Sequence, residues 1–499
     1  LDKNSNVTTG KVYWSVLQKE RHGDFGGGTV QVIPHITNEI KSRFYRAKEQ
    51  DEEKIAIIEV GGTVGDIESQ PFLDSIRQFQ HDVGHDNAIL IHVTLIPYLK
   101  ASEEMKTKPT QASVKELQGM GIQPDVLVCR SEHPLTDEIK GKIALFCNVP
   151  VSHVLQNLDV EYLYEAPLAM EREKLADVVL ESLRLENRKP DLTEWTQMVN
   201  DLRNPESTVN IAMVGKYTQL HDAYLSVMEA LKHGGIANRT KVSIKWVDSE
   251  FLTPEILDDT FAGVDGIIIP GGFGSRGTEG MILAANYARE NKIPFLGICL
   301  GMQMAMVAFA RNVLGYEDAN SSELNPDTTH PVVDLMPDQN GIENLGGTLR
   351  LGSYPCVLDK KSKAYALYGT ELINERHRHR FEINNHYRDD FTSHGMMISG
   401  QSPDGHIVEM IELPDHPFYV GIQAHPELKS RPNHAHPLFA GFVESAEEQG
   451  VLRRAKKLLM KRNHLSEPEA HRYLQKTSMD TGRTMTESAH MVTMLIHED

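Results

Sequence analysis

Short apolar runs rich in β-branched residues alternate with segments of helical periodicity along most of this chain. No other feature of the sequence constrains the fold as strongly. The alternation predicts an α/β protein in which helices cover a largely parallel sheet. The runs predicted to be strands include residues 55–60, 88–95, 125–129, 209–215, 263–269 and 293–298.

Length and charge divide the chain into parts. At 499 residues, about three domains are expected at roughly 150 residues each. The polar stretch 186–207 contains two prolines and precedes a new strand, so it predicts a linker between α/β domains at 1–185 and 208–446. Residues 451–499 carry nine Lys and Arg against six Asp and Glu, whereas 1–450 have a net charge of −22. This change of sign predicts a separate C-terminal module.

Composition excludes several classes of protein. No stretch approaches the roughly 18 unbroken apolar residues of a membrane span. The net charge of −19 argues against nucleic-acid binding by the molecule as a whole. The four cysteines lie far apart and form neither a disulfide framework nor a zinc spacing. We therefore expect a cytoplasmic protein that does not enter a membrane.

A cysteine stands at a predicted strand-to-helix junction, in the sequence Gly297-Ile-Cys-Leu-Gly301. A sharp turn at this point needs small flanking residues, because a Cβ would collide with the neighbouring strand. Such a turn places Cys299 near a helix N-terminus, where a thiolate is stabilised. The backbone N–H of Leu300 and the glycines of Pro270-Gly-Gly-Phe273 are candidate donors to an oxyanion.

A base for this thiol is offered by His425-Pro-Glu427, since an extended backbone directs the histidine and the carboxylate to the same side. The alternative interpretation is a buried structural cysteine and a simple turn. The occurrence of the glycine loop, the cysteine turn and this triplet in one order favours catalysis.

These three motifs resemble those of class I glutamine amidotransferases. The resemblance implies Cys299 as nucleophile, His425 as general base and acid, and Glu427 as the group that orients the imidazole. It also implies a glutamine site with Gly272, Leu300, Gln303, Glu323 and Arg380. Period-2 alternation puts the arginines of Arg376-His-Arg-His-Arg380 on one side. A metal site at the two histidines is the weaker alternative.

Two segments of the first domain suggest a nucleotide site. Lys106-Thr-Lys-Pro-Thr-Gln111 gathers ammonium, hydroxyl and amide groups that suit a polyphosphate and a base edge. Glu59 and the segment Gly61 to Glu68 place three carboxylates at the end of a predicted buried strand, where nucleotide and Mg²⁺ sites occur in α/β sheets. The alternatives are a solvated lysine loop and a polar turn.

From about residue 5 to about 445 the chain resembles CTP synthases, with a P-loop-type synthetase domain followed by the amidotransferase domain. The resemblance implies that ATP phosphorylates UTP, ammonia from glutamine displaces the phosphate, GTP activates and CTP inhibits. It implies a homotetramer and the following roles: Glu59 as Mg²⁺ ligand, Asp66, Ile67 and Glu68 in CTP sensing, Lys106, Thr107, Lys108, Pro109, Thr110, Gln111 and Lys142 in UTP and CTP binding, and Asp159 at ATP.

The synthetase half is expected to be incomplete. The family opens with a glycine-rich phosphate loop upstream of Thr8-Thr-Gly10, and no G-x-x-x-x-G-K-[ST] motif occurs in this sequence. Without that loop the chemistry on ATP should fail. A chain that works only as a glutaminase is therefore the alternative to full synthesis.

The C-terminal segment 451–499 is predicted to form three helices. Ser466 and Glu469 make a capping box with Pro468 in the first turn, Ala470, Tyr473 and Leu474 form one apolar face, and Met485, Ala489 and Val492 another. The segment resembles an ANTAR domain, a small RNA-binding antitermination module. Residues 452–483 hold nine basic and three acidic residues, which suits a phosphate backbone. The alternatives for this segment are a helical appendage that packs on a neighbour, and an artefact of joining two sequences. A further hypothesis for the whole chain is a regulator that binds RNA and uses the enzyme body as a nucleotide sensor.

Overall fold

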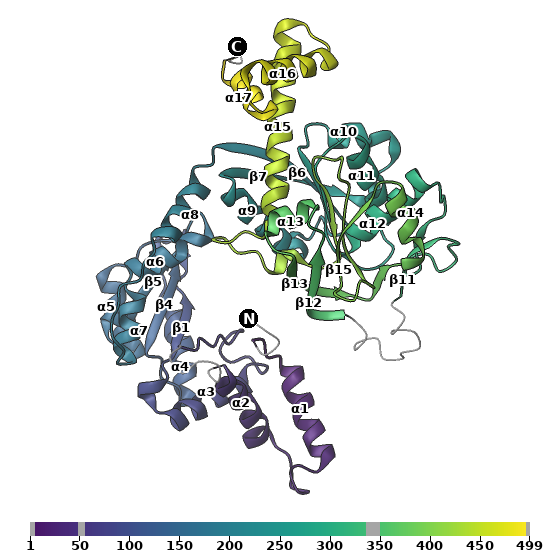
Figure 1. Cartoon of the computed structure of the whole chain (residues 1–499). Coiled ribbons are helices and arrows are strands. Elements are labelled where there is room, and N and C mark those ends of the chain that lie inside the picture. The colour runs from purple at the N-terminus through teal and green to yellow at the C-terminus, as the bar shows by residue number, and fades with distance from the viewer. Residues whose placement is uncertain (1–4, 48–54, 336–349, 496–499) are drawn as a thin grey trace. The chain divides into compact units, whose positions relative to one another are not determined.

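The computed structural model describes residues 5–47, 55–335 and 350–495. The chain separates into two compact units, Leu1–Leu192 and Thr193–Asp499, and each is described by itself. Figure 1 shows helices packed around a sheet in both units. In the described part of the chain no helix combines the length and the apolar character that crossing a membrane requires.

Unit 1 is built on a parallel sheet in the order β1-β4-β5, formed by Ile91–Leu95, Val126–Ser131 and Val154–Leu158. A hairpin of β2 (Tyr98–Leu99) and β3 (Glu104–Met105) follows β1. The helices are α1 (Thr9–His22), α2 (Thr37–Arg46), α3 (Gln70–Val83), α4 (Lys108–Gly119), α5 (Asp137–Cys147), α6 (Ala166–Arg172) and α7 (Leu175–Ser182). Cys129 and Cys147 are buried free thiols, and burial raises the pKa of Cys129 to about 12.

Residues 55–60 differ from the expected buried strand. They form no regular secondary structure, and the side chain of Ile57 is 93% exposed. An apolar β-branched run becomes a strand only where a neighbouring strand takes its backbone hydrogen bonds. In the described part of unit 1, β1 and β5 are the edges of the sheet, and residues 55–60 pair with neither. The prediction of a strand at this position was wrong.

Unit 2 contains a nine-stranded sheet in the order β13-β12-β15-β16-β17-β9-β8-β6-β7. The five strands from β17 to β7 are parallel, and β13 to β16 extend the sheet with antiparallel pairs. The strands are β6 (Ser207–Gly215), β7 (Thr240–Asp248), β8 (Gly266–Ile269), β9 (Phe295–Ile298), β12 (Arg350–Leu358), β13 (Leu372–His379), β15 (Met397–Gln401), β16 (Val408–Glu412) and β17 (Tyr419–Ile422).

Helices cover both faces of this sheet, as successive residues of β8 demonstrate. Ile267 and Ile269 belong to a core shared with α11 (Thr278–Glu290) and α12 (Leu300–Phe309), whereas Ile268 belongs to a core shared with α9 (Leu225–Ala237) and α15 (Pro437–Asn463). Burial on both faces explains the continuous apolar runs in the sequence. A small sheet of β10 (Asn320–Ser321), β11 (Pro331–Leu335) and β14 (Phe381–Ile383) lies apart from the main one.

The stretch 186–207, expected to be a linker, is partly folded. It contains α8 (Thr193–Arg203), in which Met198 and Val199 are buried, and β6 starts at its end. The polar composition therefore reflects the exposed face of a short helix.

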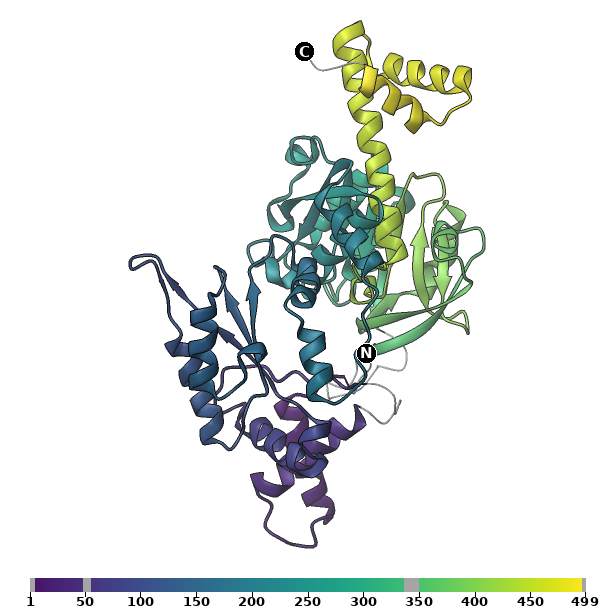
Figure 2. The same cartoon turned by 90° about the vertical axis from the view of Figure 1, so that its left-hand side faces the viewer.

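The last long helix joins two modules without a break. α15 starts in the core of unit 2 and continues to Asn463, where it packs against α16 (Glu467–Thr481) and α17 (Met485–Leu495) (Figure 2). The predicted capping box between Ser466 and Glu469 is present. Tyr473 departs from the prediction, because its side chain is 47% exposed while Ala470 and Leu474 fill the small core.

An ion pair anchors α15 where it leaves the core. Asp265 is buried and accepts a hydrogen bond from the backbone N–H of Asn210 at 2.8 Å. Arg453 lies 2.8 Å from the same carboxylate and donates to the carbonyl of Val264 at 2.9 Å. Burial raises the pKa of Asp265, so its charge depends on these partners.

Replacing Arg453 with Met should destabilise unit 2, since it removes the cation that pairs with the buried Asp265 carboxylate and leaves only the charge of Arg454 near it. We expect a loss of about 1–2 kcal/mol, because Arg453 is itself partly exposed, and a thermal midpoint lower by about 2–6 °C. Differential scanning calorimetry measures this, with Lys457→Met on the exposed side of α15 as control. Equal midpoints for the two variants would contradict the anchoring role.

Candidate active site and nucleotide-binding segments

Cys299 occupies a strained turn between β9 and α12. Its φ is +51° and its ψ is −103°, a backbone conformation that costs a non-glycine residue of the order of 1–3 kcal/mol. Both flanking glycines are required by space. A Cβ on Gly301 would lie 2.0 Å from the carbonyl oxygen of Ile269, and one on Gly297 would lie 2.8 Å from the backbone of Gly301. The turn therefore has the geometry predicted from the sequence.

His425 is held by a carboxylate and a strand. Its Nδ1 lies 2.7 Å from Oε1 of Glu427, and its backbone N–H donates to the carbonyl of Arg376 in β13 at 2.7 Å. Burial lowers the pKa of His425, but interactions with Cys299 and Glu427 outweigh it and raise the pKa to about 10. Nε2, on the other side of the ring, has no hydrogen-bond partner among the described residues. A proton on this imidazole is thus stabilised by Glu427 and by the neighbouring Cys299.

The glycine loop after β8 approaches both groups closely. A Cβ on Gly271 would lie 2.8 Å from Cε1 of His425 and 3.5 Å from Cβ of Cys299. Lys216, at the end of β6, is buried and donates from Nζ to the carbonyls of Phe273, at 3.1 Å, and of Gly274. Burial lowers the pKa of Lys216 to about 8. Lys216 is not among the predicted site residues, and it ties the loop to the sheet.

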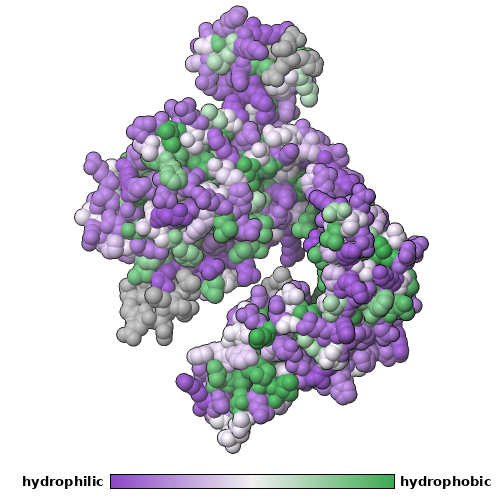
Figure 3. Space-filling model, turned by 180° about the vertical axis from the view of Figure 1, so that it is seen from behind, coloured by the Kyte–Doolittle hydropathy of each residue, from purple (hydrophilic) through white to green (hydrophobic). Residues whose placement is uncertain are grey.

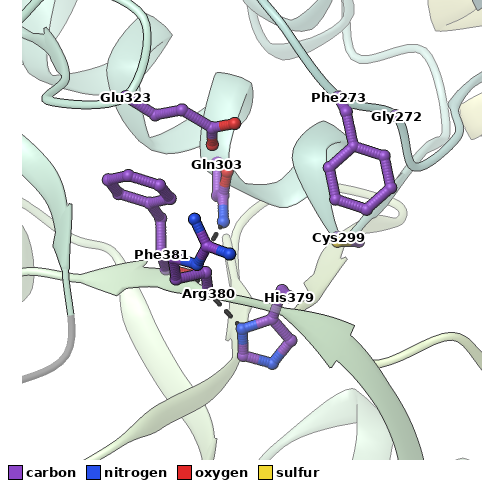
Figure 4. Close-up of a pocket in the computed structure, with 8 residues that line it drawn as sticks. All are labelled: Gly272, Phe273, Cys299, Gln303, Glu323, His379, Arg380 and Phe381. Carbon is purple, nitrogen blue, oxygen red and sulfur yellow. Dashed lines mark hydrogen bonds between the residues drawn. The ribbon is translucent and has the colours of Figure 1, made fainter. Parts of the chain in front are cut away.

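One pocket collects most of the residues predicted to bind glutamine. It encloses about 200 Å³, less than the roughly 300–1,000 Å³ of pockets for drug-sized ligands, which suits a small amino acid. Figure 4 shows the side chains of Glu323 and Arg380 opposite Cys299 and Phe273. Partial burial raises the pKa of Glu323, against the influence of Lys216 and Arg380. The lining residues are Gly272, Phe273, Cys299, Gln303, Glu323, His379, Arg380 and Phe381.

Leu300, the remaining predicted residue, is the first residue of α12. The first N–H groups of a helix have no partner within it, so this amide is suitable as an oxyanion donor. The side chain of Leu300 lies 3.5 Å from the position of a Cβ on Gly272.

Within β13 the arginines and histidines face opposite ways, as predicted for Arg376 and Arg378, whereas Arg380 follows the strand and lines the pocket together with His379. Arg376 and Arg378 are exposed, whereas His377 and His379 are buried and lie 2.8 Å apart, between Nδ1 and Nε2. Burial and the neighbouring Arg350 lower the pKa of both histidines, to about 3 for His379. In the described part of the chain no three His, Cys, Asp or Glu side chains converge as metal ligands. The weaker metal interpretation finds no support there.

The segment Lys106–Gln111 lies at the start of α4, near the carboxyl edge of the unit 1 sheet. Thr110 is buried and contacts Thr94 at the end of β1, with 2.9 Å between the two Oγ1 atoms. Lys106 pairs with Glu104, and both Lys106 and Lys142 lower the pKa of that exposed carboxylate. The charges of the two lysines therefore act on the same carboxylate, although the lysines are 36 positions apart in the sequence.

Other predicted nucleotide residues lie at the same edge or pack against α4. Asp159 follows β5 and pairs with Arg130 of β4 at 3.0 Å. The loop 61–68 packs on α4, since a Cβ on Gly65 would lie 2.2 Å from a carboxylate oxygen of Glu116. Asp66, in this loop, accepts from the N–H of Thr63 at 3.1 Å, and Ile67 is 90% exposed.

The carboxylates expected at Mg²⁺ do not form a cluster. Glu59 is exposed and follows a segment that is not a strand, and it joins no group of three metal-binding side chains with Asp66 and Glu68 among the described residues. Magnesium needs octahedral oxygen coordination, usually with one or two protein carboxylates. Among the described residues, Glu59 can therefore belong to a set of one or two protein carboxylates at most.

Comparisons with known proteins account for the whole arrangement. Family models match for the CTP synthase N-terminus at residues 1–185, class I glutamine amidotransferases at 219–445 and the ANTAR domain at 442–492. The CTP synthase of Ruminiclostridium cellulolyticum is 59% identical over 448 residues, which are 90% of this chain and 84% of that protein. The CTP synthase of Clostridium kluyveri is 58% identical over 446 residues, 89% of this chain and 83% of that protein.

Among solved structures, the chain is similar to the glutaminase domain of Trypanosoma brucei CTPS with bound acivicin. The identity is 38%, the match covers 48% of this chain and 93% of that one, and the TM-score is 0.45. The sequence relatives determine the assignment. This chain belongs to the CTP synthase family, whose reaction is the glutamine-dependent amination of UTP to CTP.

Proposed function

We propose that residues 208–446 hydrolyse glutamine with Cys299 as nucleophile, His425 as general base and acid, and Glu427 as the group that orients the imidazole. The observation that carries the proposal is the strained turn that presents Cys299 beside a histidine whose Nδ1 is held at 2.7 Å by a buried carboxylate. A structural cysteine needs neither the strain nor the ordered base.

The reaction follows from this arrangement. His425 takes the proton of the Cys299 thiol, the sulfur attacks the carboxamide carbon of glutamine, an S–C bond forms, and the carbonyl π electrons move to the oxygen. The amides of Leu300 and Gly272 stabilise that oxyanion. His425 then gives its proton to the leaving nitrogen as the C–N bond breaks, and ammonia departs. Water, deprotonated by His425, cleaves the thioester and releases glutamate.

The α-substituents of glutamine have complementary partners in the same pocket. Glu323 suits the ammonium group and Arg380 the carboxylate, since both side chains point into the cavity that Cys299 lines. Gln303 lies at the base of this pocket. We assign these three residues to binding rather than to bond breaking.

The nucleotide roles rest on the family and on the edge of the unit 1 sheet. We propose that Lys106 to Gln111 with Lys142 bind UTP and CTP, that Asp66 to Glu68 sense CTP, and that Asp159 lies at ATP. Magnesium remains a prediction from the resemblance, with Glu59 as one carboxylate ligand. Residues 1–185 make up this synthetase domain.

Activation by GTP is proposed at the rim of the glutamine pocket. Phe273 is 52% exposed there, and the guanidinium of Arg378 stands 5.8 Å above its ring. An exposed aromatic ring beside a cation suits a purine and its phosphates. Because Phe273 belongs to the glycine loop, a ligand on it would act on the oxyanion donors.

We also propose self-association as a homotetramer in the cytoplasm. Leu145 and Phe146 on α5 are 78% and 58% exposed. Large apolar side chains that are adjacent and exposed favour an interface. The cytoplasmic location is predicted because the four cysteines do not have the spacing of a disulfide framework, as is usual in a reducing compartment.

RNA binding by residues 451–499 is a second function, and a specific face of α16 favours it. Arg472, Tyr473 and Lys476 are exposed on this helix, so a ring lies beside two cations. Stacking together with phosphate contacts is how proteins hold single-stranded segments of RNA. The module shows mainly hydrophilic side chains in Figure 3, at the top of the view.

Cys299→Ala should lower glutamate release from glutamine by about 10³-fold or more, because the nucleophile is lost. A coupled glutamate assay measures this. Cys147→Ala, which removes a buried thiol of unit 1, serves as control and should retain activity. Full activity of Cys299→Ala would contradict the triad. Following CTP formation in parallel separates full synthesis from the glutaminase-only alternative.

Glutamine binding should weaken as the pH falls, because protonation removes the negative charge of Glu323. The raised pKa of Glu323 moves this loss to higher pH than for an ordinary carboxyl. Glu323→Gln should raise KM for glutamine about 10–100-fold at pH 8. In this variant KM should no longer increase as the pH falls. Glu317→Gln, the same change outside the pocket, is the control for steady-state kinetics across pH. If KM of Glu323→Gln still increases as the pH falls, the pH dependence of glutamine binding comes from another group.

Reversing the charges of Arg472 and Lys476 to Glu should weaken binding of a structured RNA at least tenfold and lower the slope of log affinity against log salt by about 2. Gel shifts at several salt concentrations measure both. The control reverses Lys115 and Lys241, two exposed lysines outside the module. Binding that is equal in the two double variants, or absent in the parent chain, leaves the module only a packing role.

A further inference from the structure

Gln423 is a fully buried amide that contacts the sulfur of Cys299. It follows β17, two residues before His425, and its exposed fraction is 0%. Its Nε2 lies 3.6 Å from Sγ of Cys299, within the range for a hydrogen bond to sulfur. Its backbone N–H donates to the carbonyl of Glu409 at 2.9 Å, so the residue is fixed on the sheet. The assigned triad gives this side chain no role.

The neighbouring Gln303 determines which end of the Gln423 amide faces the sulfur. Nε2 of Gln303 donates to the carbonyl of Phe381 at 3.1 Å and to Oε1 of Gln423 at 3.2 Å. If Gln303 were turned over, its oxygen would face the carbonyl of Phe381, and two acceptors would repel. The oxygen of Gln423 is therefore committed to Gln303, and its NH₂ group is left for Cys299.

We propose that Gln423 is a further catalytic residue of the glutaminase reaction, whose amide N–H donates to the ionised sulfur of Cys299, and that Gln303 is a positioning residue that orients this amide. The proposal rests on the proposed role of Cys299 as nucleophile. Donation to a charged acceptor stabilises it more than donation to a neutral one. The amide therefore favours the thiolate over the thiol.

The effect of the Gln423 amide on Cys299 can be separated from the effects of the charged groups near the sulfur. The titratable and charged side chains near it are His425 with Glu427, His379, Arg380, Glu323 and Lys216. None of them is changed by substitution of Gln423, whose side chain is neutral. A shift in the ionisation of Cys299 on substitution is therefore due to the lost donor.

The test measures ionisation of Cys299 directly, through the pH dependence of alkylation by iodoacetamide in the full chain. Gln423→Met keeps the length of the side chain and removes the donor. We expect the midpoint to rise by about 1–2 pH units, and kcat/KM for glutamine at pH 7 to fall about 10–100-fold, with the loss shrinking as the pH rises. Gln303→Met should shift the midpoint in the same direction by less.

Matched controls separate the possible failures. Gln401→Met removes a half-buried amide of unit 2 that is bonded to Arg388, and should leave the midpoint unchanged. An unchanged midpoint in Gln423→Met overturns the proposal, whatever the activity. If that variant does not fold, Gln423→Leu also removes the donor without adding a charge, and should raise the midpoint by a similar amount. Failure of the triad itself would appear separately, as alkylation and glutamate release that persist in Cys299→Ala.

Discussion

The left-handed backbone conformation at Cys299 is the constraint on which the rest of the site depends. A φ of +51° turns the chain from β9 into α12 within one residue. This turn brings the sulfur above the sheet and the first amides of α12 toward the same space. The chain can adopt this conformation because two glycines leave space for it. Gly301 lets α12 approach Ile269, and Gly297 lets the backbone of Gly301 approach β9. Packing on both faces of the sheet holds the strain in place.

Much of the amidotransferase site could be predicted from sequence because its spacing is local. Cys299 lies between two glycines, and Glu427 lies two residues from His425, so backbone geometry alone relates them. Gln423 was not predicted, although it lies two residues before His425 and therefore on the same side of an extended backbone. Lys216 could not be predicted, because its contact with Phe273 depends on the order of β6 and β8 in the sheet.

In the synthetase half, a strand is harder to predict from sequence, because its formation depends on a partner strand. Residues 55–60 have the composition of a strand, yet a strand exists only through pairing, which a single segment does not encode. Conversely, Lys106 and Lys142 act on one carboxylate, that of Glu104, only because tertiary packing brings together segments 36 residues apart. Tyr473 is a third case, since helical periodicity predicts a face but not how far the core extends.

Because α15 is continuous, the C-terminal module is not an independent domain on a flexible linker. The boundary expected between residues 446 and 451 lies inside one helix of 27 residues, roughly 40 Å long. Arg453 contributes to the ion pair with Asp265 of the core, while Ala455 and Leu459 belong to the core of the module. The two folds therefore share a helix rather than a linker. Removing residues 451–499 would also remove a cation from a buried carboxylate, so an effect of truncation on glutamine hydrolysis would not by itself show that the module regulates the enzyme. Substitutions confined to the exposed face of α16 leave that ion pair intact and separate the two contributions.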